Sequence, residues 1–548
     1  MRPIIIKLGM VLAIFAACPL TAQTALDRVD PTQEEERAQD AERVRPSVDA
    51  RIGTVQPVAS VAPSGTYTVS AIMLVGLVAL ETGDFADILE SYAGRKLSGV
   101  DLVDLSNAIA SRARAEGYLF ATAAIPPQPL GLGILRLSID EGAIDEIRLE
   151  GEDDPAIRAQ LAPLLNSGPV TLGRLERQVL LADDISGVRI RRTRYEREGE
   201  RGVLLVETTR EYFAGRAEIT NDGSEPVGPL RARIDVDLNG LISPFDEVDL
   251  TFSTNPVEPG ELQFASARYT VTINSAGTEI STNGSYSVTR PGSFLTNRDI
   301  FGESTRVGVR ISHPVLRSRT ISAWVQGTLE LRDLRQDRFG TLVRHDRIPV
   351  ARVGIYGLGN WGNNRLRGRI EVSQGLDILN ATQLGDPLAS RDDAAPDFTT
   401  VSAWAEYRRR LDHGLSVAMA GRGQISSEPL LIAEDLGIGG PRFLRGYNFS
   451  ERTGDEGIMG FGELRYDWRN ALGILRRAQF YGYADGGVVS NLQDGRGGGS
   501  LASAGGGIRT DITRELDFNV ELAVPLTGPR FDSDDESPRV NVSMSHTF

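Results

Sequence analysis

From about residue 211 to the end of the chain, apolar and polar residues alternate with a period of two, in segments of about ten residues. Between residues 230 and 238 the even positions are apolar, while the odd positions carry Arg231, Arg233, Asp235 and Asp237. Clusters of Gly, Asn, Asp and Pro separate the segments. This pattern predicts β-strands that have one apolar and one charged face, joined by turns.

A soluble β-sandwich would also alternate, but with shorter strands and an outward charged face. An arginine facing lipid at mid-depth costs about 2–4 kcal/mol, so in a barrel the apolar face meets lipid and the charged face a wet lumen. The chain ends on an aromatic residue, Phe548, which suits an outer-membrane assembly signal. We therefore predict a transmembrane β-barrel over residues 211–548.

Sixteen segments of this kind can be counted. The strands are expected to begin near residues 211, 229, 247, 261, 278, 304, 319, 347, 364, 397, 411, 457, 476, 498, 513 and 538. An even number of antiparallel strands places both barrel ends on the same, periplasmic side. The connection after the eleventh strand, at about residues 426–456, is then the sixth surface loop, and sixteen strands are enough to leave an aqueous channel.

Residues 66–210 show a different pattern, which alternates between a period of two and a period of about 3.6. The order strand, helix, helix, strand, strand occurs twice, once over residues 66–143 and again over residues 144–210. The expected helices lie near residues 85–92, 102–116, 155–165 and 171–184. This repetition predicts two small α+β domains in series before the barrel.

The first 25 residues combine Arg2 and Lys7 with a short apolar stretch, which predicts a cleaved secretory signal. Later apolar runs fall short of the roughly 20 residues that a transmembrane helix needs. The single cysteine, Cys18, is compatible with an incidental residue of the signal and with a lipoprotein processing site. Residues 26–45 predict a charged helix without an apolar face, either disordered or held in a polar cavity, and residues 46–65 predict an extended linker.

Composition excludes several classes of function. The formal net charge of −15 argues against nucleic acid as a partner, and the only lysines, Lys7 and Lys96, lie outside any phosphate-binding loop motif. The sequence has no nucleophile elbow of the G-x-S-x-G type. The histidines form no metal-binding motif, being scattered at His313, His345, His413 and His546. We expect no catalytic residues, no cofactor and no metal.

Two motifs carry the candidate function. The sixth loop contains Leu444, Arg445, Gly446 and Tyr447, and Tyr483, Asp485 and Gly487 follow two strands later. Strand parity places Tyr483 and Asp485 on the charged, lumenal face. An inward arginine removed from water needs a carboxylate partner, and the glycines leave room for the backbone to approach the wall.

These motifs resemble those of the outer-membrane transporters of two-partner secretion, the TpsB or ShlB/FhaC/HecB family of the BamA-related superfamily. Leu444 to Tyr447 match its [VIL]-R-G-[FY] loop motif, and Tyr483 to Gly487 match its F-x-D-x-G motif with Tyr for Phe. The resemblance implies that Arg445 and Asp485 form an ion pair that holds the loop inside the barrel. The two α+β units are similar to the family's paired POTRA domains, especially at residues 117–128 and 140–144, and residues 26–45 resemble its plug helix.

The resemblance implies a transporter in the outer membrane of a Gram-negative bacterium, with its POTRA domains in the periplasm. Its partner would be a large secreted exoprotein of the TpsA type, with a β-helical, haemolysin-like or adhesin-like fold, which some relatives also activate. Outer-membrane lipid and, during biogenesis, the barrel-assembly machinery would be further partners. A BamA-like insertase, which usually carries more POTRA domains, and a passive porin, which needs none, remain the alternatives.

Overall fold

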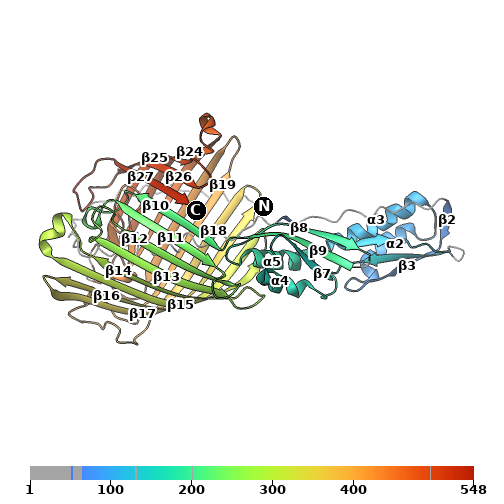
Figure 1. Ribbon diagram of the computed structural model, residues 1–548, viewed down its shortest axis with the longest axis horizontal. Helices are drawn as coiled ribbons and strands as arrows, with labels where there is room; N and C mark the ends of the chain where they lie inside the picture. Colours follow the sequence, from blue (N-terminus) through green and yellow to red (C-terminus); the bar gives the residue numbers. More distant parts are fainter. Residues whose placement is uncertain (1–50, 53–64, 130–132, 200, 494, 496) are drawn as a thin grey trace, which may run out of the picture.

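The computed structural model describes residues 51–52, 65–129, 133–199, 201–493, 495 and 497–548. The described chain is elongated, with a large barrel at one end and two small domains projecting in line from it (Figure 1). The predicted signal at residues 1–25 and the predicted plug helix at residues 26–45 lie outside the described residues. Among the described helices, none combines the length and the apolar character needed to cross a membrane.

The barrel is a closed sheet of sixteen antiparallel strands, which confirms the predicted fold class. In order around the barrel the strands are β10 (Phe213–Thr220), β11 (Arg231–Asn239), β12 (Asp246–Thr254), β13 (Leu262–Thr272), β14 (Glu279–Thr289), β15 (Ile300–Arg317), β16 (Ile321–Arg338), β17 (Thr341–Trp361), β18 (Asn364–Gly375), β19 (Thr399–Arg410), β20 (Leu415–Ser426), β23 (Glu456–Arg469), β24 (Arg477–Ser490), β25 (Gly499–Asp511), β26 (Leu516–Pro525) and β27 (Arg539–Thr547). The last strand, β27, pairs with β10 and closes the ring.

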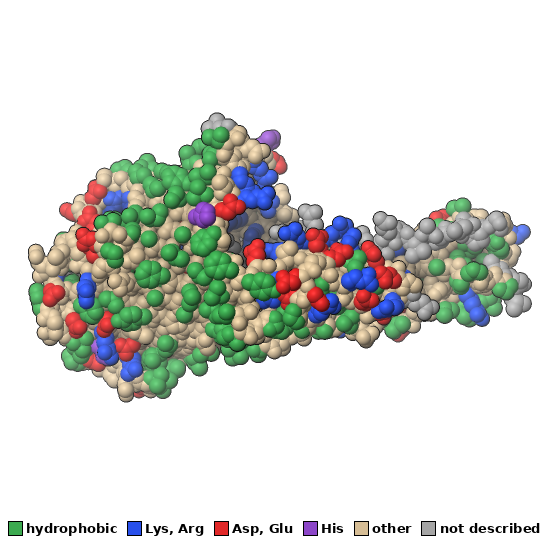
Figure 2. Space-filling view, in the orientation of Figure 1, with side chains coloured by type: hydrophobic (Ala, Val, Ile, Leu, Met, Phe, Trp, Pro, Cys, Tyr) green, Lys and Arg blue, Asp and Glu red, His purple; other side chains and the backbone are tan. Residues whose placement is uncertain are grey.

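The two faces of each strand lie in different surroundings, as the alternation predicts. On β23 the apolar residues Leu464, Tyr466 and Trp468 point outward and are 40 to 55% exposed, whereas Glu463, just before Leu464, is 4% exposed. Hydrophobic side chains are spread in patches over the visible outer wall of the barrel (Figure 2). The outer face is thus suited to lipid, and the polar groups lie in the lumen.

The first small unit contains β2 (Thr66–Val69), β3 (Ala71–Val75), α2 (Ala86–Tyr92), β4 (Arg95–Ser98), α3 (Gly99–Ala115), β5 (Thr122–Ala124) and β6 (Ile134–Asp140). Its sheet has the order β3-β6-β5, and Phe85, Leu105 and Leu137 lie in its core. Strand β4 was not predicted, since its four polar-rich residues show no alternation and its pairing with β2 depends on tertiary contact.

The second small unit contains β7 (Glu146–Glu150), α4 (Pro155–Leu161), η3 (Ala162–Leu164), α5 (Leu172–Asp183), β8 (Val188–Glu198) and β9 (Arg201–Arg210). Helices α4 and α5 pack their apolar sides, including Ile157, Leu175 and Val179, against the sheet. The sheet order is β1-β8-β9-β7, in which β1 (Arg51–Ile52) comes from the predicted linker. A segment that precedes the first unit therefore completes the sheet of the second.

The second unit is joined to the barrel by polar contacts with two tight turns, one between β13 and β14 and one between β15 and β16. Arg317 donates to Asp184 at 2.6 and 2.7 Å, and Arg319 Nε lies 2.6 Å from Glu176. Gln160 and Gln178 both donate to the carbonyl of Ser275, at 2.8 and 3.0 Å. In the order around the barrel, β13 is the fourth strand and β15 the sixth, so these turns lie at the end where the chain enters the barrel. The sixth loop follows the eleventh strand and therefore lies at the opposite end.

Candidate functional site

The sixth loop connects β20 to β23 and folds into the lumen. It contains the short helix η6 (Ile432–Glu434) and a hairpin of β21 (Leu436–Ile438) and β22 (Arg452–Gly454). The side chains at its tip are almost completely covered: Leu444 is 0%, Tyr447 1% and Arg445 5% exposed. The tip packs in an apolar cluster that includes wall residues Met459, Val489 and Leu501.

Arg445 is bound by carboxylates from three barrel strands. Its Nε and Nη2 donate to the two oxygens of Asp485 on β24, at 3.2 and 3.1 Å, and its main-chain N–H donates to the same carboxylate at 3.0 Å. Its Nη1 lies 2.9 Å from Glu463 on β23 and 3.3 Å from Glu521 on β26. The structure thus brings together Arg445 and Asp485, with two further acids that the sequence did not single out.

Aromatic rings complete the site. The Arg445 guanidinium carbon lies 3.4 Å from the Tyr483 ring centroid, which allows a cation–π contact. In the same way Arg509 lies 3.7 Å from the Tyr481 ring centroid and donates to Glu463 at 2.7 Å. Tyr483 lies flat because Gly505 is its partner on β25, where an added Cβ would come within 2.6 Å of the tyrosine oxygen.

The remaining motif residues fit the loop to the wall. A Cβ at Gly446 would lie 2.9 Å from the main-chain N of Pro525, and one at Gly487 would lie 3.0 Å from Leu444 Cδ1. The Tyr447 hydroxyl lies 3.0 Å from Thr527 Oγ1 and accepts from the Thr527 N–H at 3.1 Å. Both glycines are therefore required by close approach, since a side chain at either would separate the loop from the barrel.

We call Arg445, Asp485, Glu463 and Glu521 the lock. Within hydrogen-bonding range of its acids lie two more cations, Arg509 and Arg465, the latter 2.5 Å from Glu463. Three arginines thus meet three carboxylates, a balance that suits a desolvated site. Period-two alternation put Glu463 and Glu521 on the lumenal face, but only the stagger of the strands decides which acids meet Arg445.

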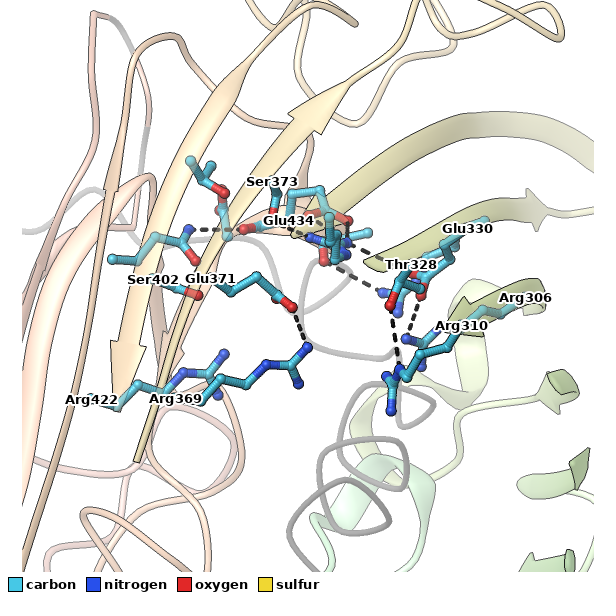
Figure 3. Close-up of a pocket in the computed structure, with 16 residues that line it drawn as sticks. Arg306, Arg310, Thr328, Glu330, Arg369, Glu371, Ser373, Ser402, Arg422 and Glu434 are labelled. Carbon is cyan, nitrogen blue, oxygen red and sulfur yellow. Dashed lines mark hydrogen bonds and ion pairs between the residues drawn. The ribbon is translucent and has the colours of Figure 1, made fainter. Parts of the chain in front are cut away.

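A second lumenal contact of the loop borders a polar cavity of about 140 Å³ (Figure 3). Here Arg352 on β17 donates to both oxygens of Glu434 on η6, at 2.7 and 2.9 Å. On the two neighbouring strands, Arg306 of β15 lies 2.5 Å from Glu330 of β16. The lining carries six arginines and four acids: Arg306, Arg310, Arg332, Arg352, Arg369, Arg422, Glu330, Glu371, Glu434 and Asp435. The cavity is polar, with an excess of cations.

The terminal residue lies at the seam where the barrel closes. The N–H groups of Gly215 and Phe548 each donate to the other residue's carbonyl, at 2.8 and 2.9 Å. The Phe548 ring is 55% exposed on the outer face, 6.0 Å from the ring of Phe213. Its position is compatible with the predicted assembly signal.

Three lumenal carboxylates on neighbouring strands come close enough to share a cation. Oxygens of Asp237, Glu247 and Asp249 all lie within 4.8 Å of one another, and the side chains are half-buried. Acidic groups of this kind are common without an ion. The donors are hard oxygens, which would suit calcium or magnesium rather than zinc.

The family emerges from comparison with known proteins. The model of the family described as haemolysin secretion/activation protein ShlB/FhaC/HecB matches residues 199–510, more than half of the chain. The chain belongs to this family. A POTRA domain of the ShlB type matches residues 67–142.

Membership makes the protein an outer-membrane transporter of the two-partner secretion type, with its POTRA domains in the periplasm. The family match favours this function over the insertase alternative. Members of the family are transporters rather than enzymes.

Relatives support the assignment. The chain is 23% identical over 474 residues to the heme/hemopexin transporter protein HuxB of Haemophilus influenzae, covering 81% of each chain. It is 23% identical over 438 residues to the outer membrane transporter CdiB of Dickeya dadantii, covering 75% of this chain and 74% of that one. The solved structure of CdiB from Escherichia coli has the same fold, with a TM-score of 0.76, 18% identity and coverage of 97% and 100%.

Proposed function

We propose that the protein captures one large, unfolded exoprotein in the periplasm through its POTRA domains and moves it through the barrel to the cell surface. The observation that carries this proposal is the sixth loop, a long surface connection held inside a sixteen-stranded lumen by buried side chains. A passive porin has no use for an arginine loop of this kind or for two periplasmic domains. Folding of the partner outside the cell would supply direction, since the sequence offers no nucleotide site.

The lock is proposed to hold the loop tip in its resting place until the exoprotein enters. Arg445 and Asp485 are 5% exposed each, and truncating one partner of a buried pair strands the other charge at a cost of about 3–5 kcal/mol. Such a contact is strong enough to fix one position of the loop. It is made mainly by side chains, so it can be exchanged for contacts with a passing chain.

Strand β8 of the second POTRA domain is the proposed capture edge. In the described part of the chain its outer side pairs only with β1, at Arg192 and Thr193. Arg189, Arg191 and Arg192 are exposed, and the β-bulge next to Ile190 places both Arg191 and Arg192 outward. An extended segment that carries acidic side chains could add to this edge by main-chain hydrogen bonds.

Residues 26–45 are proposed to occupy the lumen before transport. From residue 27 to residue 45 the sequence carries seven acidic and four basic side chains, a balance opposite to that of the arginine-rich cavity of Figure 3. Deletion of residues 26–45 is therefore expected to raise single-channel conductance in a planar bilayer. An unchanged conductance would remove the plug from the proposal.

The transport proposal is tested by expressing the chain in a Gram-negative host together with a candidate large exoprotein from a neighbouring gene. The expected result is appearance of the exoprotein at the surface, and its loss when residues 66–143 are deleted although the barrel still conducts ions. Export that continues without residues 66–143 would contradict capture by the first POTRA domain.

Removal of Phe548 is expected to lower barrel assembly in the membrane, which heat-modifiable gel mobility reports.

A further inference from the structure

Asp455 lies at the base of the sixth loop, between β22 and β23, and is 0% exposed. Its carboxylate accepts the N–H of Leu430 at 2.7 Å, from the first part of the same loop. It also accepts the N–H of Leu492 at 2.7 Å, from the seventh surface loop between β24 and β25. Its third partner is Arg391 of the fifth surface loop, whose Nη1 lies 2.8 and 2.9 Å from the two oxygens.

Arg391 extends the same node. Its Nη2 donates to the carbonyl of Leu492 at 2.6 Å, and its guanidinium also binds Asp393 of its own loop, with Nε at 2.5 Å. The seventh loop fits closely around it, since a Cβ at Gly495 would lie 2.5 Å from Arg391 Nη2. One buried ion pair thus connects the fifth, sixth and seventh loops.

The fifth and sixth loops also pack together inside the outer end of the lumen. Phe398 and Ala394 of the fifth loop contact Leu430 and Leu431 of the sixth, over Ile348 on the inner face of β17. The N–H of Ile432 donates to Ser390 Oγ at 3.1 Å. These contacts form a layer at the surface end, and that layer shares no residue with the lock.

We infer that Asp455 and Arg391, which we call the outer latch, hold the three loops together over the surface exit of the lumen. A chain that leaves the barrel must displace this layer. The carboxylate makes several hydrogen bonds in a buried place, so removing its charge leaves main-chain N–H groups of two loops and one arginine poorly satisfied. The latch therefore positions loops five and seven on loop six, and its opening is a step separate from the release of Arg445.

The test measures exposure of the loop layer directly, without any exoprotein. Ala394 is 1% exposed, and the only cysteine of the sequence is Cys18, in the predicted signal. Cells carrying Ala394→Cys are treated with a membrane-impermeant maleimide, and cells without this cysteine give the background. Adding Asp455→Asn or Arg391→Gln is expected to speed labelling at least about tenfold, because each removes charged hydrogen bonds.

Glu428→Gln and Arg298→Gln, at exposed positions of the sixth and third loops, are the matched controls and are expected to leave the labelling rate unchanged. Equal rates in the latch and control variants would overturn the inference. Because no exoprotein is present, this result is independent of whether the proposed capture and transport are correct.

A second measurement covers the case in which a latch variant does not assemble. In the otherwise unaltered chain, Ser390→Cys and Ile432→Cys are joined by a short thiol-bridging reagent, which fixes the fifth loop on the sixth. The expected result is loss of exoprotein release, which returns when a reductant cleaves the bridge. Release that continues through the bridged protein would show that the layer does not have to open and would overturn the inference.

Discussion

Two buried contacts between arginine and carboxylate join parts of this molecule, one inside the barrel and one between the barrel and the second POTRA domain. In the lock, Arg445 meets three acids and the face of Tyr483. At the domain junction, Arg317 meets Asp184, with Ser322 Oγ at 3.2 Å and the Trp324 ring at 5.6 Å. Both arginine side chains are at most 5% exposed.

The difference lies in what else holds each part. Asp184 follows α5 directly and Arg317 ends β15, so both stand on rigid elements, and Gln160, Gln178 and Arg319 make further contacts beside them. The tip of the sixth loop is attached to the wall mainly by side chains. Loss of the arginine should therefore reduce secretion more at the lock than at the domain junction.

The largest effect is expected for Arg445→Ala or Asp485→Asn. Arg445→Ala leaves the buried Asp485 carboxylate without its cation, at a cost of about 3–5 kcal/mol. Asp485→Asn removes the carboxylate that accepts from Nε, Nη2 and the main-chain N–H of Arg445. In both variants the loop tip is expected to leave its site. Secretion of the exoprotein is expected to fall to background, measured in the culture medium, while heat-modifiable mobility shows an assembled barrel. Arg445→Lys should restore little, because an ammonium group cannot reproduce the two-pronged contact.

A smaller effect is expected for Gly487→Val. The new side chain would collide with Leu444 Cδ1 and with Met459 Cβ, which lies 2.9 Å from the added Cβ, and overpacking of this kind costs about 1–3 kcal/mol. Gly486→Val is the matched control, since nothing lies within 4 Å of a Cβ at that position. Equal secretion by the two variants would mean that close packing of Leu444 is not required.

Arg317→Ala is expected to weaken secretion by less than the lock variants. Burial raises the pKa of Asp184 while Arg317 lowers it, so loss of the arginine leaves a buried acid that would take up a proton more readily. The measurement is hydrogen exchange of the turn at residues 273–278 and of α5, which should quicken. Arg319→Ala, at a side chain that is 42% exposed, should change exchange much less. A larger loss of secretion than in Arg445→Ala would reverse the comparison.

The smallest effect is expected far from both contacts, at the start of α3. Asp101 accepts from the Ser98 hydroxyl and N–H, both at 2.7 Å, and these bonds lower its pKa below the ordinary value of 3.8. A carboxyl group whose pKa is lowered on folding stabilises the folded form at a pH above its ordinary pKa. This contribution is lost as the pH falls through the folded-state pKa. As the pH falls through this pKa, hydrogen exchange at the first turn of α3 should become faster. Asp101→Asn should remove that pH dependence without changing secretion.

The features that could be predicted from the sequence differ between these regions. The sixteen barrel strands and the faces of their residues were predicted from local alternation, because the apolar and polar faces of a strand are visible within ten consecutive residues. The junction did not, because nothing in the sequence around Arg317 distinguishes it from the many other lumenal arginines. Strand β4 and the pairing of β1 with β8 were also missed, since short strands carry almost no periodic signal.

By itself, the sequence determined the barrel, its strand number and the loop motif. Its resemblance to the family's motifs implied the pairing of Arg445 with Asp485. Only the tertiary structure decided that Glu463, Glu521 and Tyr483 surround the arginine, and that Asp455 connects three loops. The physical reason is range. Alternation is a property of consecutive residues, whereas the stagger between strands and the folding of loops into the lumen bring together residues that are distant in the chain.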